Sequence, residues 1–526
     1  MDTDVAQGTH ALGPGRRIGL ARTPRRALAL LVILVAIAVA GLYYATADRA
    51  PASVPSSVAT LRRPAAVTSV LRGTQAALAA DVAAQFFAAA PAVVIASPSR
   101  PALLATAARD AVGRSAPLLL ASANTAAGAA APLSPAVRAE VLRLHPSSVL
   151  AVGIAAPALA AQLPGVSVVT RLAALPAGRP PAHLHRVALL MRQGRSATEV
   201  AAAATARSAG VQVIALNQDD PRADPAAIRM LATTKPQRVL ALGAGFGTAR
   251  ALAAKIAVAE TGVQLPGGGQ ILFPGHRLVA IYGSPGTPAL GALGQQGLQA
   301  SIARVRSLAA PYRAMSRVPV VPAFEILATV AQGSPGRNGL YSYESSVASL
   351  RPWVRQANKD GLYVILDLQP GRANLLAQAK LYRSLLKLPD VGLALDPEWK
   401  LQPGQRPLQQ IGSVHIAEVN SVVRWLAALT ARNHLPQKLL VLHQFRLSMI
   451  IGESRLDTRH SDLAIVIHMD GQGAPSSKQQ TWNAITRAAP RGVFFGWKNF
   501  FVKDHPMETP QETMRHHPRP VMISYQ

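Results

Sequence analysis

The C-terminal half of the chain contains eight apolar runs of strand length, and this series limits the possible folds more than any other feature of the sequence. The runs are RLVAIYG (277–283), PVVPAFEIL (319–327), LYVILDLQ (362–369), VGLALDPEW (391–399), KLLVLHQF (438–445), LAIVIHMDG (463–471), GVFFGWK (492–498) and PVMISYQ (520–526). Segments with helical periodicity separate most of them. Eight strands that alternate with helices over 250 residues match the size and element count of a (β/α)8, TIM-like barrel. An open doubly wound sheet is the alternative.

The preceding region, residues 67–262, alternates shorter apolar runs with alanine-rich helical segments. The runs are AVVIAS (92–97), PLLLAS (117–122), SVLAVG (148–153), RVALLM (186–191), VQVIAL (211–216) and RVLALG (238–243). Strands that alternate with helices predict an α/β domain with a mostly parallel sheet. Residues 263–276 are expected to link this domain to the barrel. A helix near 249–260 is expected to cover the last barrel strand.

An internal repeat is visible within the α/β region. HPSSVLAVG at 145–153 reappears as KPQRVLALG at 235–243, a spacing of 90 residues, and AVVIAS and RVALLM lie at nearly the same spacing. We therefore expect two copies of one α/β unit.

The first copy resembles the cell wall-binding repeat 2 family of bacterial surface proteins over roughly residues 85–172. The resemblance depends on PLLLAS followed by LSPAVRAEVLRLHPSSVLAVG (133–153), with a weaker second copy that extends to about residue 262. ASPSRPALLATAA (96–108) replaces the family's usual acidic segment after the first strand. The resemblance implies contact with anionic polymers of the cell wall.

The N-terminus has the charge pattern of a membrane anchor. A basic tail (1–26) is followed by ALALLVILVAIAVAGLYYATA (27–47) and by a Pro/Ser/Ala-rich linker (48–66). Roughly 20 uncharged residues can span a bilayer. The arginines before the span predict a cytoplasmic N-terminus with the remaining domains outside the cytoplasm. Because ATA at 45–47 has the form of a cleavage site, a cleaved signal peptide and a secreted product are the alternative.

The charge and the cysteine content agree with such a location. The formal net charge is +28, and the sequence contains no cysteine. Its arginines are scattered without a recognisable nucleic-acid-binding motif, so we expect no nucleic-acid partner. A basic protein of this kind is better suited to a cell wall polysaccharide or another anionic envelope polymer.

Polar residues gather at the C-terminal ends of the predicted barrel strands, where the active sites of such barrels lie. Strand residues two positions apart share a face. The site candidates, in chain order, are Tyr282, Glu325, Asp367, Gln369, Asp396, Glu398, His443, His468, Asp470 and Lys498, with Trp399 and Trp497 beside them. One such residue at a strand end is commonly a cap or a loop anchor. Their convergence on one end predicts a functional site.

Glycoside hydrolysis is the chemistry that this set favours, and the barrel resembles glycosidase barrels in layout. The reaction needs one protonated carboxyl group as acid and one ionised carboxylate as nucleophile or base, and Asp396, Glu398 and Asp470 are the catalytic candidates. Tyr282, Trp399 and Trp497 are expected to stack on sugar rings. The substrate-binding candidates are these three aromatic residues together with Glu325, Asp367, Gln369, His443, His468 and Lys498.

Three alternatives remain open. Asp367, Asp396, His443, His468 and Asp470 are suitable ligands for a divalent metal. No motif with metal-ligand spacing is present, so no metal ligand is assigned and no cofactor is expected. Lys498 is a candidate Schiff-base lysine, although neutralisation of a carboxylate is its favoured role. The non-enzymatic alternative is a barrel that binds a cell wall polysaccharide without cleaving it.

The segment HPMETPQETMRHHPRP (505–520) precedes the last strand. It is interpreted as a loop, with metal binding by His505, His516 and His517 as the alternative. Within it, Thr509, Pro510 and Glu512 have the spacing of a helix start with a capping box.

Overall fold

A computed structural model describes residues 58–122, 133–176 and 183–526. The predicted span at 27–47 lies outside these residues. No helix in the described ranges has the length and the apolar character needed to cross a bilayer.

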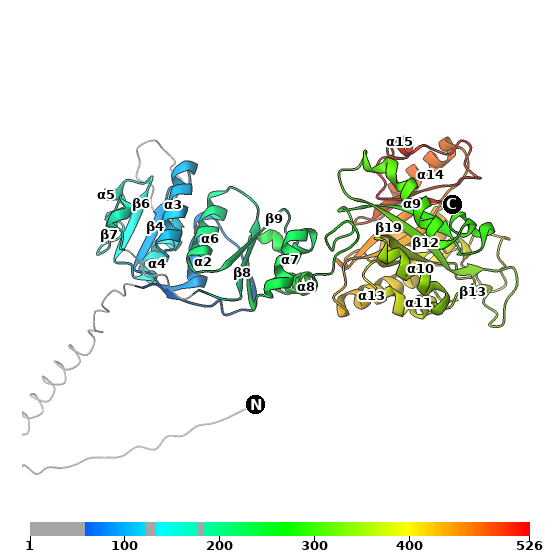
Figure 1. The fold of residues 1–526 in the computed structure, drawn as a ribbon, viewed down its shortest axis with the longest axis horizontal. Helices are drawn as coiled ribbons and strands as arrows, with labels where there is room; N and C mark the ends of the chain where they lie inside the picture. Colours follow the sequence, from blue (N-terminus) through cyan, green and yellow to red (C-terminus); the bar gives the residue numbers. More distant parts are fainter. Residues whose placement is uncertain (1–57, 123–132, 177–182) are drawn as a thin grey trace, which may run out of the picture. The chain divides into compact units, whose positions relative to one another are not determined.

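The C-terminal region is a closed barrel of eight parallel strands, as the sequence predicted (Figure 1). Every neighbouring pair is parallel, and β11 closes the barrel by pairing with both β12 and β21. The strands are β11 (Arg277–Gly283), β12 (Val320–Ala331), β14 (Tyr363–Leu368), β15 (Val391–Leu395), β17 (Lys438–Gln444), β19 (Leu463–Met469), β20 (Phe494–Asn499) and β21 (Met522–Tyr525). Closure excludes the open doubly wound sheet.

Helices cover the outside of the barrel. They are α9 (Leu298–Arg313), α10 (Val347–Lys359), α11 (Leu375–Leu381), α12 (Arg383–Leu386), α13 (Ile416–Arg432), α14 (Pro475–Ala488) and α15 (Pro510–Thr513). Short strands lie in the loops: β13 (Ser342–Glu344), β16 (Val414–His415) and β18 (Ile450–Ile451). α15 begins with the predicted capping box, because the Thr509 hydroxyl accepts from the Glu512 amide and the Glu512 carboxylate accepts from the Thr509 amide.

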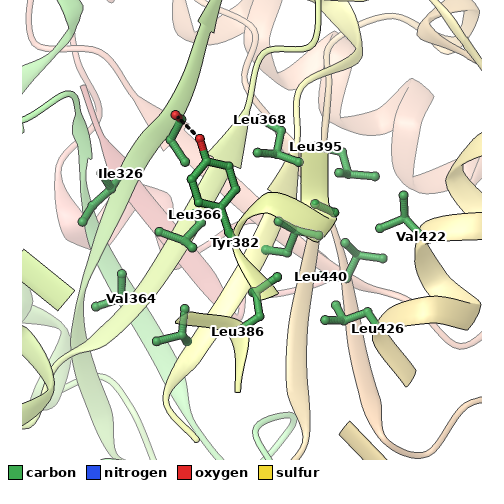
Figure 2. Close-up of a cluster of buried hydrophobic side chains, with 14 of the residues drawn as sticks. Ile326, Val364, Leu366, Leu368, Tyr382, Leu386, Leu395, Val422, Leu426 and Leu440 are labelled. Carbon is green, nitrogen blue, oxygen red and sulfur yellow. Dashed lines mark hydrogen bonds between the residues drawn. The ribbon is translucent and has the colours of Figure 1, made fainter. Parts of the chain in front are cut away.

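The largest apolar core lies between the barrel strands and these helices (Figure 2). Leu366, Leu395 and Leu440 point outward from three neighbouring strands and pack with Val422 and Leu426 of α13. Alternate residues of the same strands point inward and form a second apolar cluster, which includes Leu278, Val321, Ile365, Leu439, Val466 and Met522. The barrel interior is therefore packed below its C-terminal end.

The α/β region contains two four-stranded parallel sheets. Their strand orders are β5-β4-β6-β7 and β9-β8-β10-β2. The strands of the first are β4 (Ala92–Ala96), β5 (Leu118–Leu120), β6 (Ser148–Val152) and β7 (Ser167–Val169). Those of the second are β2 (Thr68–Leu71), β8 (Val187–Arg192), β9 (Gln212–Leu216) and β10 (Arg238–Leu242). The two orders are equivalent: β4 lies between β5 and β6 in the first sheet, and β8 lies between β9 and β10 in the second. The fourth strand, β7 or β2, is at the edge beside β6 or β10.

Each of the two repeat units also contains an equivalent helix, at the 90-residue spacing of the repeat. α4 (Pro135–Leu144) and α7 (Pro225–Thr234) each begin with proline and end at a left-handed residue, His145 or Lys235, just before another proline. The other helices are α2 (Gln75–Phe86), α3 (Pro101–Gly113), α5 (Ala156–Ala160), α6 (Ala197–Ser208) and α8 (Ala249–Ala259); β1 (Thr60–Leu61) pairs with β3 (Phe87–Ala89).

The expectation for the helix near 249–260 was wrong. α8 packs through Leu252, Ile256 and Ala259 onto the second α/β sheet rather than onto the barrel. The last barrel strand is instead covered by α9 and by the segment that follows α15, because Ile523 and Tyr525 pack with Ala309, Tyr312 and Met514.

Candidate active site at the barrel mouth

Each of the eight barrel strands positions one inward polar side chain toward the C-terminal end of the barrel; Glu325 lies midway along the long strand β12, and Asp396 directly follows β15. The eight residues are Tyr282, Glu325, Asp367, Asp396, His443, His468, Lys498 and Ser524, all of which are buried. They lie above the apolar interior, because each follows apolar residues of the same face along its strand. A polar layer in this position is expensive unless its members bond to one another.

Six members of the layer are joined in pairs by short contacts, and His443 also contacts Asp470 above it. His443 Nε2 lies 2.9 Å from Glu325 Oε1, and His443 Nδ1 lies 3.3 Å from Asp470 Oδ2. The Tyr282 hydroxyl donates to Asp367 Oδ2 at 3.0 Å, and His468 Nε2 lies 2.7 Å from Ser524 Oγ. The imidazole of His443 thus joins carboxylates from two sides of the barrel.

A cleft of about 1150 Å³ opens above this layer. Seven of the twelve residues predicted from the sequence line it: Tyr282, Gln369, Asp396, Glu398, Trp399, Asp470 and Lys498. Asp396 and Glu398 both line it, but Glu398 does so for a different reason from the one expected. β15 ends at Leu395, and Pro397–Trp399 form a single 3-10 turn, so strand alternation does not position Glu398.

The other five predicted residues do not line the cleft. Glu325, Asp367, His443 and His468 lie in the polar layer with no measurable exposure. They therefore act on the cleft through their neighbours rather than by touching a ligand directly.

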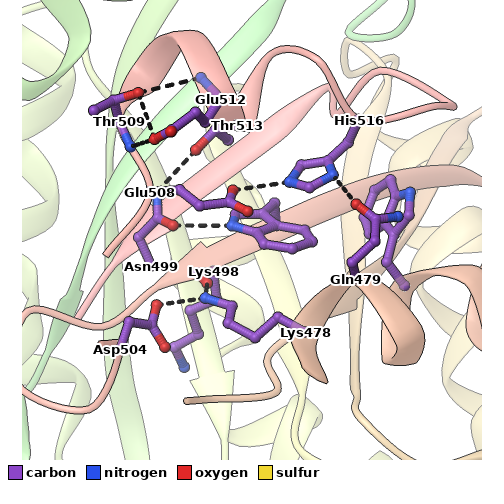
Figure 3. Close-up of polar contacts among 12 residues, drawn as sticks. Lys478, Gln479, Lys498, Asn499, Asp504, Glu508, Thr509, Glu512, Thr513 and His516 are labelled. Carbon is purple, nitrogen blue, oxygen red and sulfur yellow. Dashed lines mark hydrogen bonds and ion pairs between the residues drawn. The ribbon is translucent and has the colours of Figure 1, made fainter. Parts of the chain in front are cut away.

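The prediction that Trp497 stacks on a sugar was wrong. Because Lys498 points into the barrel, the preceding residue of β20 points outward. Trp497 is fully buried there, with its ring stacked on that of His516 at 3.8 Å and edge-on to that of Trp482 at 5.5 Å. His516 is in turn held between Gln479 and Glu508 (Figure 3), so it has a packing role.

The sequence argument also missed cleft residues that come from loops. Phe445, Arg446, Phe500 and Lys503 line the cleft together with the segment 408–411. Phe445 and Phe500 follow the inward residues His443 and Lys498 by two positions, and this spacing is a signal that could have found them. Arg446, Lys503 and the segment 408–411 have no such periodic pattern.

The environment separates the proton affinities of the acids that line the cleft. Burial raises the pKa of Glu398 to about 7, and the nearby Asp470 carboxylate adds to the shift. Burial also raises the pKa of Asp396 well above its ordinary value, reinforced by Glu398 and Asp367. For Asp470, burial alone would raise the pKa, but contact with His443 and the charge of Lys498 hold it below its ordinary value. One cleft thus combines carboxyl groups whose pKa values are shifted in opposite directions.

The buried acid and imidazoles below the cleft are shifted as well. Burial raises the pKa of Asp367 to about 6. For His443, burial alone would lower the pKa, but Glu325 and Asp367 raise it well above the ordinary value. Burial and the charge of His443 lower the pKa of His468 well below it. These shifts favour the charged form of His443 and the neutral form of His468.

No protein-family model matches the chain, and no curated protein shows a significant match to it. In the three described ranges, no group of three or more His, Asp or Glu side chains is arranged to hold a metal ion.

Proposed function

We propose that the barrel is a glycoside hydrolase in which Glu398 is the general acid and Asp470 is the nucleophile or general base. The observation that carries the proposal is the pairing of these two carboxyl groups in one cleft with opposite pKa shifts. Environments that push the pKa values of neighbouring acids apart mark the acid and base roles. Glycoside hydrolysis requires one carboxyl group in each state.

The proposed roles follow from the contacts of each side chain. Glu398 has a pKa near neutrality, so it can protonate the oxygen of the leaving sugar and be reprotonated afterwards. Asp470 is kept ionised by His443, which suits attack on the anomeric carbon or activation of water. Asp396 stays neutral and can donate a hydrogen bond. Trp399 lines the cleft and offers an aromatic face for a sugar ring.

We further propose that the substrate is a cell wall polysaccharide or another envelope polymer reached outside the cytoplasm. The basic leader and the apolar segment 27–47 support a membrane anchor, and the net charge of +28 supports contact with an anionic polymer. The α/β region, through the resemblance of its first copy, is proposed to attach to the wall.

The test is release of reducing ends from purified wall polysaccharide by the full-length chain. Wild type should release sugar, whereas Glu398→Gln and Asp470→Asn should each lose about 10²-fold or more of the rate, as expected for acid–base groups. Asp396→Asn mimics a neutral carboxyl and should retain more activity than either. Equal release of sugar by wild type and all three variants would contradict the assignment of Glu398 and Asp470 as the catalytic groups. Binding without turnover by wild type would favour the non-catalytic polysaccharide-binding alternative.

A further inference from the structure

Lys498 lines the cleft, and in the described part of the chain its ammonium group lies against aromatic rings rather than beside an acceptor. The residue is only 3% exposed, yet it lines the cleft from the end of β20. Among the described residues it forms neither a side-chain hydrogen bond nor an ion pair. Its Nζ instead lies 3.7 Å from the centre of the Tyr282 ring and 5.3 Å from that of Phe500.

Such an arrangement leaves hydrogen-bonding capacity unused. An ammonium group has three donors, and a buried cation is costly unless it is paired. Contact with aromatic faces returns about 1 to 2 kcal/mol at a desolvated site. Within the described residues no nearby acid bonds to this ammonium group: Asp367 accepts from Tyr282, Asp470 contacts His443, and neither pairs with Lys498. The three donors are thus available to a ligand in the cleft.

The backbone of Lys498 is also held in place from outside the barrel (Figure 3). Lys478 Nζ donates to the carbonyl oxygen of Lys498 at 2.8 Å and pairs with the buried carboxylate of Asp504. Asp504 in turn accepts from the amides of Gly473 and Phe500, both at 2.9 Å. This buried pair fixes the end of β20 before any ligand arrives.

We propose that Lys498 binds an anionic substituent of the substrate, a carboxylate or a phosphate, above the Tyr282 ring. The inference rests on the proposed function and narrows its substrate class to charged glycans. Gln369, which lines the cleft beside Tyr282, provides a neutral polar neighbour. Arg446 and Lys503 are exposed and line the same cleft, where they add attraction for an anionic chain.

The test measures binding rather than turnover. The full-length chain with Asp470→Asn, which prevents cleavage, is titrated calorimetrically with polygalacturonate, with carboxyl-reduced polygalacturonate and with a polyol-phosphate polymer. At least one charged polymer should bind about 10-fold or more tightly than the neutral one, the scale of one added ion pair. The better charged polymer distinguishes a carboxylate from a phosphate.

Variants assign the preference to one side chain. In the same background, Lys498→Met should remove the preference for charge and Lys498→Arg should keep most of it. Lys387→Met, which removes an exposed lysine that does not line the cleft, should change the affinity less than about 3-fold. Circular dichroism checks the fold. If Lys498→Met fails to fold, the test uses the Asp470→Asn chain alone. Its preference for the charged polymer should then disappear when inorganic phosphate is added as a competitor.

Three outcomes would overturn the proposal: no binding of either charged polymer, equal affinity for charged and neutral polymers, or a preference that survives Lys498→Met. If the wild-type chain binds charged polymers preferentially but releases no sugar, the anion site is supported and the proposed hydrolase activity is contradicted.

Discussion

The imidazole of His443 lies directly beneath Asp470, with Nδ1 3.3 Å from Oδ2. Its other nitrogen lies 2.9 Å from a second buried acid, Glu325. The acids raise the pKa of His443 well above the ordinary value, although burial opposes the shift. An imidazolium shared by two buried carboxylates therefore keeps Asp470 ionised, so a residue outside the cleft sets the charge of one that lines it.

Replacement of His443 by Gln should move the acidic limb of the pH–activity profile to higher pH. Without the cation, burial dominates and the pKa of Asp470 rises, by about one unit or more for a buried acid. The profile of kcat/KM for the wall polysaccharide measures the shift. His415→Gln, an exposed histidine at the start of α13, is the control. An unchanged acidic limb in His443→Gln would show that His443 does not set the charge of Asp470.

The same histidine should make stability depend on pH. Because folding raises the pKa of His443, the protonated imidazole contributes its full stabilisation below the unfolded pKa of about 6.5. This contribution is lost as the pH rises through the higher pKa of the folded state. Loss of the cation also leaves the Asp470 carboxylate as an unpaired buried charge, a cost of about 3 to 5 kcal/mol. Urea denaturation should therefore show a larger deficit for His443→Gln at pH 6 than at pH 9.

Glu398→Gln should stabilise the protein at pH 8 and leave it nearly unchanged at pH 4. The pKa of Glu398 rises from 4.5 to about 7 on folding, so the folded state binds the proton more tightly. Wild-type stability consequently falls as pH rises from about 4.5 to about 7. A neutral Gln avoids this loss, which after solvent screening amounts to about 1 to 2 kcal/mol. Equal stability of both proteins at pH 8 would contradict the shift.

Much of the barrel was predictable because its signal is periodic. All eight predicted runs became strands, and inward alternation correctly grouped Asp367, His443 and Lys498 at one end. Alternation failed at Glu398, because Pro397 starts a 3-10 turn after the strand ends. Strand alternation would also have excluded Trp497 from the residues that face the cleft, because the adjacent Lys498 points inward.

The division between cleft and supporting layer was not predictable. Depth inside a barrel depends on the stagger of its strands and on loop conformation, and neither is encoded by local spacing. The sequence therefore placed both His443 and Asp470 in contact with the substrate, although the structure buries the first beneath the second.

The pair of Lys478 and Asp504 should be essential to stability. Both side chains are buried, and Asp504 also accepts from two backbone amides. Lys478→Met leaves an unpaired buried carboxylate, so unfolding in urea should show a loss of about 3 to 5 kcal/mol. Adding Asp504→Asn to this variant should recover part of the loss, because the amide removes the charge and keeps its acceptor oxygen. A loss below about 1 kcal/mol in Lys478→Met would mean that the pair behaves like a surface ion pair.

Gly496 provides the space that His468 occupies. A Cβ at residue 496 would lie 2.0 Å from His468 Nδ1, and the imidazole cannot retreat easily because its Nε2 is held by Ser524 at 2.7 Å. Gly496→Ala should therefore cost about 2 to 3 kcal/mol through overpacking. Gly113→Ala, at an exposed helix end with nothing within 4 Å of the added methyl, should not destabilise the protein. The double variant Gly496→Ala/His468→Ala should lose less than the sum of its single variants, as measured by urea unfolding, and strict additivity would show that the two side chains do not compete for this space.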